Sequence, residues 1–286
     1  MQAIEVIDWN DTLKIVEQIA QVVGEQLRTN FQQISAQSRT ASAKTDGSLV
    51  TQSDRWADRT IAQMLLDKFP GYGLLSEESV QVFPHQDWCW VVDPLDGTSN
   101  FSHGIPIWAI SLGLLYKGVP VFGYVHLPPL QQSFHGWFAG GVTGIELPPD
   151  AAFLNGKQIR SVQELPPDIP LSNYFFSCCS RSLERIGIAK YPCKLRMLGV
   201  ASYNLLTVAT GSTLGAVEAT PKIWDIAAAW VITQAAGAIW LPLESGAIFP
   251  LEGDRDYGDR NFPTLVVSSA QMKLIFKPIV QSIGNL

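Results

Sequence analysis

The chain has 286 residues, of which 47% are hydrophobic and 16% are charged. This balance is typical of a folded globular protein and excludes a disordered or fibrous one. The 20 basic residues stand against 26 acidic ones, which gives a formal net charge of -6. Such a chain lacks the basic surface that attracts nucleic acid or anionic membranes, so we expect it to bind neither.

The cysteines and the first residues of the chain predict a soluble, cytoplasmic protein. No C-x-x-C pair and no zinc-ligand spacing occurs among the four cysteines, so we expect reduced thiols at Cys89, Cys178, Cys179 and Cys193. The first ten residues contain acids instead of a basic signal region. The longest apolar stretch, residues 107–116, is about half the length that a membrane-spanning helix needs.

Apolar spacing predicts two helices at the start of the chain. Apolar residues recur at steps of three and four from Leu13 to Ile34, which indicates one long amphipathic helix. A second helical pattern follows Ser53 and stops at Pro70. We expect Ser53 to cap this helix, and Asp54 to lie in its first turn.

The rest of the chain alternates strands and helices. The run WCWVV from Trp88 has the length of a strand and is expected to end at Asp93-Pro94, and residues 107–126 form a predicted hairpin. After a Gly/Pro-rich passage at 136–149, we expect helices at 201–210 and 225–236, strands at 214–219, 238–241 and 264–269, and a last helix. These elements predict a layered α/β protein of two closely packed lobes, residues 1–150 and 151–286.

The hexapeptide DPLDGT, residues 93–98, carries the strongest chemical signal. Asp93 and Asp96 lie three residues apart across a proline-stiffened turn, and two converging carboxylates suit a hard cation such as Mg²⁺. The backbone N–H groups of Gly97 and Thr98 can bind an anion if a helix begins there. The alternative is an ordinary surface turn in which an aspartate caps a helix.

Two further acidic positions are ambiguous in isolation. Glu77 and Glu78 follow the apolar pair Leu74-Leu75, so a strand end could bring one carboxylate to the same cation, or both could be solvated. Asp225 precedes a predicted helix, where it could bind a metal or simply serve as an N-cap.

Four segments occur together in the order seen in one family: KTDGSLVTQSD (44–54), SEES (76–79), DPLDGTSNF (93–101) and WDIAA (224–228). With them the chain resembles the inositol monophosphatase family of Mg²⁺-dependent, lithium-sensitive phosphomonoesterases, from about residue 10 to about residue 275. The resemblance implies an αβαβα sandwich and a homodimer.

The resemblance also implies the metal ligands and the catalytic residues. Glu77, Asp93 and the Leu95 carbonyl would bind a first Mg²⁺, and Asp93, Asp96 and Asp225 a second. A third, weaker metal would lie between Glu77 and Asp54. Asp54 and Thr98 would orient and deprotonate the attacking water, the backbone of Gly97 and Thr98 would bind phosphate, and the loop that contains Lys44 would approach the site.

The charges agree with this assignment. About five carboxylates in one cleft would repel a phosphate, and two or three Mg²⁺ ions bring the site near neutrality. One metal would activate the attacking water and the other would stabilise the leaving oxygen.

The leaving-group residues implied by the resemblance are Gly199, Ala201 and Glu218, the last as the acceptor of substrate hydroxyl groups. Lys222 stands where animal inositol enzymes have histidine, and its charge could favour a substrate with a second anionic group. We therefore expect hydrolysis of a small phosphate monoester, foremost inositol 1-phosphate. Histidinol phosphate, fructose 1,6-bisphosphate and adenosine 3',5'-bisphosphate remain alternatives, as does a non-catalytic protein that binds a partner.

Overall fold

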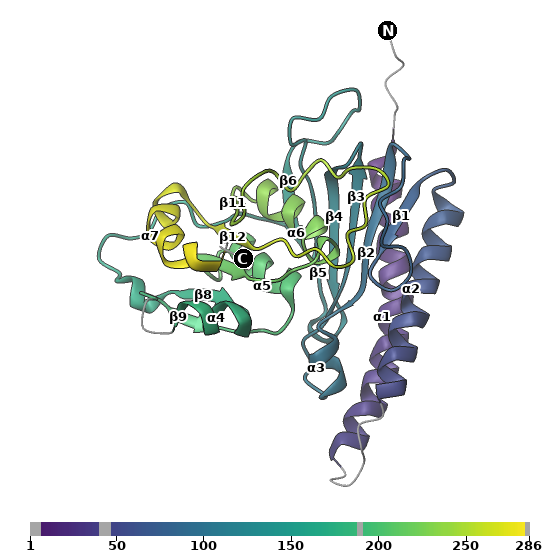
Figure 1. Cartoon of the computed structure of the whole chain (residues 1–286), viewed down its shortest axis with the longest axis horizontal. Helices are drawn as coiled ribbons and strands as arrows, with labels where there is room; N and C mark the ends of the chain where they lie inside the picture. The colour runs from purple at the N-terminus through teal and green to yellow at the C-terminus, as the bar shows by residue number, and fades with distance from the viewer. Residues whose placement is uncertain (1–6, 40–46, 188–190, 284–286) are drawn as a thin grey trace.

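The computed structural model of the chain describes residues 7–39, 47–187 and 191–283. They form two β-sheets with helices between and outside them (Figure 1). Within these residues no helix is both long and apolar enough to span a membrane.

The first sheet follows the order of the chain. Its strands β1 and β2 are parallel, and every later pair is antiparallel. The strands are β1 (Gly73–Ser76), β2 (Trp88–Asp96), β3 (Ala109–Tyr116), β4 (Val119–Leu127), β5 (Gln132–Trp137), β6 (Ala151–Leu154) and β7 (Lys157–Ile159). The change to the second sheet therefore comes after Ile159, about ten residues beyond the lobe boundary expected near residue 150.

The second sheet is smaller and mixed. Its strands, in spatial order, are β11 (Ile239–Pro242), β12 (Thr264–Val267), β10 (Gly215–Glu218), β8 (Phe175–Cys178) and β9 (Lys194–Arg196). Strand β10 is parallel to β8 and antiparallel to β12. Its carboxyl end leads directly to the segment before Asp225.

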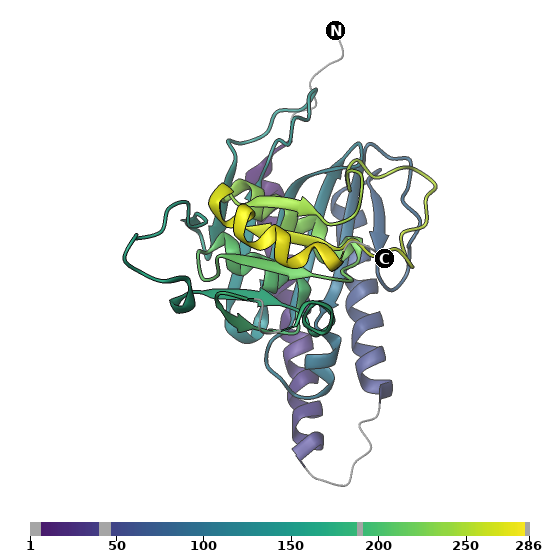
Figure 2. The same ribbon diagram turned by 60° about the vertical axis from the view of Figure 1, so that its left-hand side comes forward.

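The helices lie in three layers. Helices α1 (Trp9–Arg39) and α2 (Gly47–Lys68) cover one face of the first sheet, and α5 (Ala201–Ala209) and α6 (Ile223–Ala235) lie between the sheets. Helices α4 (Ser180–Ile186) and α7 (Ala270–Val280) cover the outer face of the second sheet (Figure 2). Short helices occur at α3 (Thr98–Ser102), Pro128–Leu130, Leu171–Asn173 and Gln281–Ile283. The expected αβαβα sandwich is confirmed.

The predicted hairpin and helices are mostly confirmed. The turn between β3 and β4 is formed by Lys117 and Gly118, both with positive φ, as a two-residue hairpin turn requires. Helix α6 begins at Ile223, two residues before the position expected from the sequence.

The predicted start of the second helix is wrong. Helix α2 begins at Gly47, so Ser53 is not its N-cap and Asp54 lies in its interior. The polar stretch before Ser53 lacks apolar periodicity, which is why the pattern placed the start of the helix too late. Asp54 is nevertheless 7% exposed, because α2 packs against β2.

The predicted end of the WCWVV strand is also wrong. Strand β2 continues through Pro94 to Asp96, with an irregular register between Asp93 and Asp96. A proline is tolerated at such an irregular position because no ladder hydrogen bond is needed from its nitrogen.

Helix α6 lies very close to the first sheet, and glycine permits this. A Cβ atom at Gly123 of β4 would lie 2.4 Å from the Ala228 carbonyl oxygen, and one at Gly113 of β3 would lie 3.0 Å from the Ala227 Cβ. Small residues on both surfaces thus fix the depth of α6 and, with it, the position of Asp225.

Candidate active site

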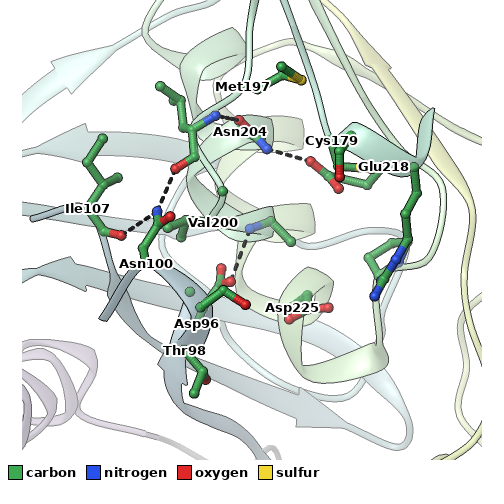
Figure 3. A pocket seen from close by; sticks show the side chains of 18 of the residues that line it. Asp96, Thr98, Asn100, Ile107, Cys179, Met197, Val200, Asn204, Glu218 and Asp225 are labelled. Atoms are coloured by element: carbon green, nitrogen blue, oxygen red, sulfur yellow. Dashed lines mark hydrogen bonds between the residues drawn. The ribbon is translucent and has the colours of Figure 1, made fainter. Parts of the chain in front are cut away.

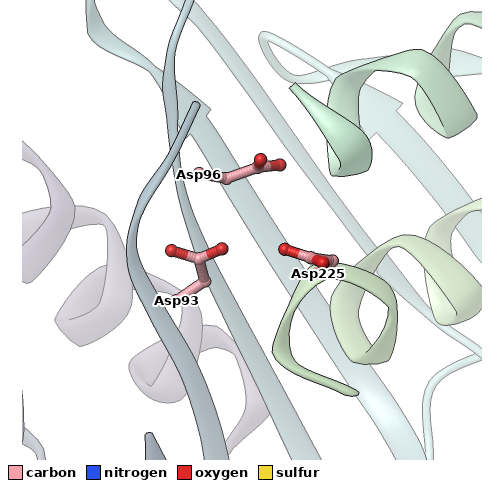
Figure 4. A group of neighbouring side chains, drawn as sticks. All are labelled: Asp93, Asp96 and Asp225. Atoms are coloured by element: carbon pink, nitrogen blue, oxygen red, sulfur yellow. The ribbon is translucent and has the colours of Figure 1, made fainter. Parts of the chain in front are cut away.

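Three aspartates from two distant segments meet at the end of β2. Asp93 and Asp96 lie at the carboxyl end of this strand, and Asp225 lies in the first turn of α6 (Figure 4). Each offers a carboxylate oxygen, and the three oxygens lie within 4.8 Å of one another. This is the geometry of a cation site with oxygen ligands.

The irregular register of β2 explains how Asp93 and Asp96 converge. Residues three apart in a regular strand point to opposite faces of the sheet. Asp93 pairs with Ser111 and Asp96 with Ala109, so the two strands differ by one residue over this stretch. The extra residue turns the Asp96 side chain to the face that Asp93 occupies.

Asp225 is oriented by its own helix and by the first sheet. Its Oδ2 accepts the backbone N–H of Lys222 at 2.6 Å. The Ser111 hydroxyl donates to the carbonyl oxygen of Trp224 at 3.2 Å, which ties the start of α6 to β3. Because Ser111 is the cross-strand neighbour of Asp93, one strand position supports both sides of the cluster.

Glu77 joins this cluster from the neighbouring strand. It follows β1 directly, and its N–H donates to the carbonyl oxygen of Val92 at 3.3 Å, so it lies beside Asp93. Its carboxyl group also shares a hydrogen bond with that of Asp93. Of the two possibilities left open by the sequence, the structure thus has the one in which a strand end places Glu77 beside the aspartates.

The carboxyl groups have raised pKa values. Burial and the charge of Glu78 raise the pKa of Asp54 to about 7. Burial and the neighbouring acids raise the pKa of Glu77 to about 7 and that of Asp225 to about 8. Burial and the same neighbours raise the pKa of Asp93 well above its ordinary value. Crowded, desolvated carboxylates repel one another unless cations balance them.

The donor set fits a divalent cation. The ion pairs found among the described residues lie at the surface, and none involves the clustered aspartates or Glu77. The oxygens that converge here are carboxylate oxygens, which are ligands that Mg²⁺ prefers. A bound divalent cation would supply the positive charge that the described neighbours do not provide, and it would lower the pKa values of these carboxyl groups.

The start of α3 lies next to the cluster. Gly97 has a φ of 96°, which glycine adopts without strain, and a Cβ there would lie 2.7 Å from Val200 Cγ2. Thr98 begins the helix, and its hydroxyl donates to the Leu95 carbonyl oxygen at 3.0 Å. The condition that a helix begins at this point is met, so N–H groups of its first turn are free of partners within the helix.

A cleft of about 620 Å³ opens beside these residues. Figure 3 shows Asp96, Thr98 and Asp225 on one side of it and Cys179 and Glu218 on the other. Of the predicted substrate residues, Gly97, Thr98, Gly199, Ala201 and Glu218 line the cleft.

Not every predicted site residue lines the cleft: Asp93 and Leu95 do not, although they precede Asp96, which does. Lys222 is not among the residues that line the cleft, and its backbone N–H binds Asp225. Asp54 does not line the cleft either, although its charge helps to raise the pKa of Glu77. Lys44 lies outside the residues that the structure describes.

Glu218 lies at the far side of the cleft and is only 4% exposed. Its Oε1 accepts the Asn204 side-chain amide at 2.6 Å, and its carboxyl group also shares a hydrogen bond with the Cys179 thiol. Burial and the neighbouring Cys179 raise its pKa well above the ordinary value. Glu218 is therefore a held, inward-facing group instead of a solvated strand end.

Asn100 positions the wall of the cleft, a role that no sequence pattern indicated. Its side-chain amide donates to the carbonyl oxygens of Ile107 and Leu198, each at 2.8 Å (Figure 3). A Cβ at Gly199, whose φ is 74°, would lie 2.7 Å from Asn100 Oδ1. Asn100 thus holds the segment that contains Gly199 against α3.

Comparisons with known proteins agree with this geometry. The model of the inositol monophosphatase family matches residues 8–281. An inositol-1-monophosphatase of Mesorhizobium japonicum is 30% identical over 93% of this chain and 97% of its own length. A histidinol-phosphatase of Mycobacterium tuberculosis is 33% identical over 80% of this chain and 86% of its own.

The fold is shared with a solved structure, the inositol monophosphatase of Anabaena (Nostoc) sp. PCC 7120. That structure superposes with a TM-score of 0.70 at 22% identity, and covers 96% of this chain and 98% of its own. With the family model and the Mesorhizobium relative, which span nearly the whole chain, this shows that the protein belongs to the inositol monophosphatase family of phosphomonoester hydrolases.

Proposed function

We propose that this chain is a Mg²⁺-dependent phosphatase that hydrolyses a small phosphate monoester, foremost myo-inositol 1-phosphate. The convergence of Asp93, Asp96 and Asp225 beside a cleft carries this proposal, because it joins a cation site to a space for a leaving group. The family relatives named for inositol-1-phosphate hydrolysis support the choice of substrate.

In this proposal two or three Mg²⁺ ions bind per site. Glu77, Asp93 and the Leu95 carbonyl hold the first, Asp93, Asp96 and Asp225 hold the second, and Glu77 with Asp54 holds a third. When bound, the metal supplies positive charge that acidifies water and stabilises the leaving oxygen.

The chain's own residues orient the reactants. The N–H groups of Gly97 and Thr98 bind the phosphate oxygens, which directs the phosphorus toward the side of the cleft that holds Asp96 and Asp225. The Thr98 hydroxyl and Asp54 hold the attacking water, and Asp54 receives its proton.

The leaving group occupies the other side of the cleft. Glu218 accepts hydrogen bonds from ring hydroxyls, and Gly199 and Ala201 line the space beside the ring. A buried carboxylate discriminates well, because a substrate without hydroxyls would leave it unpaired. In the same proposal the enzyme is a cytoplasmic homodimer that Li⁺ inhibits.

The test is phosphate release from inositol 1-phosphate with and without Mg²⁺, and with added Li⁺. Histidinol phosphate, fructose 1,6-bisphosphate and adenosine 3',5'-bisphosphate are assayed in parallel. Mg²⁺-dependent release that is greatest for inositol 1-phosphate supports the proposal. Greater release from another ester replaces the substrate and keeps the chemistry. No release by protein shown to bind Mg²⁺ favours the partner-binding alternative.

Glu218→Gln is the variant that tests the leaving-group assignment. The amide keeps the size of the side chain but loses acceptor strength, so KM for inositol 1-phosphate should rise while Mg²⁺ affinity stays the same. Equal KM values in the two proteins would remove Glu218 from the substrate site.

A further inference from the structure

The cleft contains one cationic side chain that the proposed chemistry does not use. Arg181, in the first turn of α4, is the only lysine, arginine or histidine among the described residues that line the cleft. The acidic residues that line it are Glu77, Asp96, Glu218 and Asp225. The metals would balance the acids near β2, so Arg181 provides a separate positive charge.

The guanidinium group of Arg181 is held in place but not neutralised. Its Nη1 donates to the Thr220 hydroxyl at 2.7 Å. No carboxylate of the described residues lies within ion-pair distance of it, since the ion pairs there involve other residues. A guanidinium has five N–H donors in a planar fork, so several remain for a ligand.

The position of Thr220 fixes where this charge lies. Thr220 lines the cleft and belongs to the short segment that joins Glu218, at the end of β10, to Asp225 in α6. Arg181 is thus attached to the segment that runs from the leaving-group side of the cleft to the metal ligands. A leaving group in contact with Glu218 lies beside this segment.

We propose that Arg181 binds a second phosphate group when the leaving group carries one, so that the cleft accepts bisphosphates as well as inositol 1-phosphate. The planar guanidinium matches two phosphate oxygens at once, which gives geometric selectivity as well as charge. The cleft volume of about 620 Å³ falls in the range of small-molecule sites and leaves space beyond the reacting phosphate. This inference rests on the proposed function, and it assigns to Arg181 the role that the sequence suggested for Lys222.

The experiment compares kcat/KM for inositol 1-phosphate with that for a set of bisphosphates: inositol 1,3-bisphosphate, inositol 1,4-bisphosphate and fructose 1,6-bisphosphate. Arg181→Gln should lower kcat/KM for at least one bisphosphate about tenfold to hundredfold, and should affect the monophosphate far less. Arg181→Lys keeps the charge without the fork and should lose part of this preference.

Two further variants separate ligand binding from a structural role. Arg185→Gln removes an exposed arginine of the same helix that does not line the cleft, and it should leave the substrate ratio as in the wild type. Thr220→Val removes the internal hydrogen bond but keeps the guanidinium, so it should lower the bisphosphate rate less than Arg181→Gln does. Thr220→Val acting as strongly as Arg181→Gln would overturn the proposal in favour of a brace between α4 and the loop.

The outcomes also separate this proposal from the proposed function. Wild-type protein that hydrolyses no ester with Mg²⁺ contradicts the proposed function itself. Wild-type protein that hydrolyses inositol 1-phosphate, with equal losses for mono- and bisphosphates in Arg181→Gln, overturns the role of Arg181 and leaves the phosphatase assignment standing.

Discussion

The Asp96 carboxylate accepts the backbone N–H of Ser202 at 2.7 Å, and its other oxygen accepts that of Ala201 at 3.0 Å. A proposed metal ligand at the end of β2 therefore also binds the first turn of α5, in the other half of the chain. Asp93 differs, because its one backbone contact is with the neighbouring Leu95, whose N–H it accepts at 2.9 Å.

This difference predicts that Asp93→Asn and Asp96→Asn, which keep the shape of the side chain, lose activity alike but differ in stability. Both Asp93→Asn and Asp96→Asn should abolish Mg²⁺-dependent turnover, because each removes a negatively charged ligand. In metal-free buffer Asp93→Asn should be as stable as the wild type or more so, since it relieves repulsion with Glu77 and Asp225. Asp96→Asn should lose about 1–2 kcal/mol, because its amide nitrogen cannot accept the second N–H.

The measurement is urea unfolding of the three proteins in EDTA, alongside phosphate release in Mg²⁺. Equal stability of the two variants would contradict the role of Asp96 in anchoring α5. Retained full activity in Asp93→Asn would contradict the metal assignment.

The raised carboxyl pKa values predict an unusual pH dependence of stability without metal. Unfolded carboxyl groups titrate near pH 4, whereas in the folded chain the pKa values of Asp54 and Glu77 are about 7 and that of Asp225 is about 8. Between these limits the folded state binds more protons than the unfolded state. The contribution of these carboxyl groups to the free energy of unfolding therefore falls as pH rises from about 4 to about 8.

Thermal unfolding at pH 5.5, 6.5, 7.5 and 8.5 in EDTA measures this effect, and Tm should decrease along the series. Added Mg²⁺ should raise Tm most at the highest pH, because the metal competes with protons for the same oxygens. A Tm that rises with pH in EDTA, or a Mg²⁺ effect that is largest at pH 5.5, would refute the charge assignment.

Much of this site was predictable from the sequence, because its acidic residues lie at the ends of apolar runs: Asp93 and Asp96 follow one, and Asp225 precedes another. Asp93, Asp96 and Asp225 all adjoin buried segments whose direction the hydrophobic pattern indicates. The resemblance then joined these fragments into one site. The fold class was predictable from the hydrophobic periodicity of the segments, and the hairpin was predictable from its turn residues.

The remaining features depend on contacts between distant segments. Asn100 reaches the carbonyl oxygen of Leu198, and Arg181 reaches the Thr220 hydroxyl, yet nothing in the local sequence pairs these positions. The start of α2 differs from the predicted one because residues 47–52, GSLVTQ, contain only the adjacent apolar pair Leu49-Val50, which does not show helical spacing.

The contact between Gly123 and α6 predicts a defect that is transmitted to the site. In Gly123→Ala the new Cβ would meet the Ala228 carbonyl oxygen at 2.4 Å, so the helix backbone must move. We expect a loss of about 1–3 kcal/mol in stability and weaker Mg²⁺ binding, because α6 carries Asp225.

Gly253→Ala is the control for this variant. Its Cβ would lie 2.7 Å from His85 Nδ1, but that ring is exposed and can rotate away. Its stability and Mg²⁺ affinity should match those of the wild type. The prediction fails if Gly123→Ala binds Mg²⁺ as tightly as Gly253→Ala, measured by calorimetric titration.

The surroundings of the four cysteines predict that one of them reports on occupancy of the cleft. Cys89, Cys178 and Cys193 are buried, and burial raises the pKa of Cys178 to about 12 and that of Cys193 to about 11. Cys179 lines the cleft and is half-buried. Burial raises its pKa, but hydrogen bonds with the Ala219 N–H, with Ser182 and with the Glu218 side chain together lower it below the ordinary value.

Iodoacetamide at pH 7.5 should therefore alkylate Cys179 before the other three thiols, since the thiolate is the reacting form. Inorganic phosphate with Mg²⁺ should slow this reaction by occupying the cleft. Intact mass and peptide mapping over time measure the order of labelling, and Cys179→Ser should lack the fast phase. Fast labelling at Cys193 would contradict the expected order of reactivity. A labelling rate at Cys179 that does not respond to phosphate and Mg²⁺ would show that Cys179 does not face the ligand-binding space.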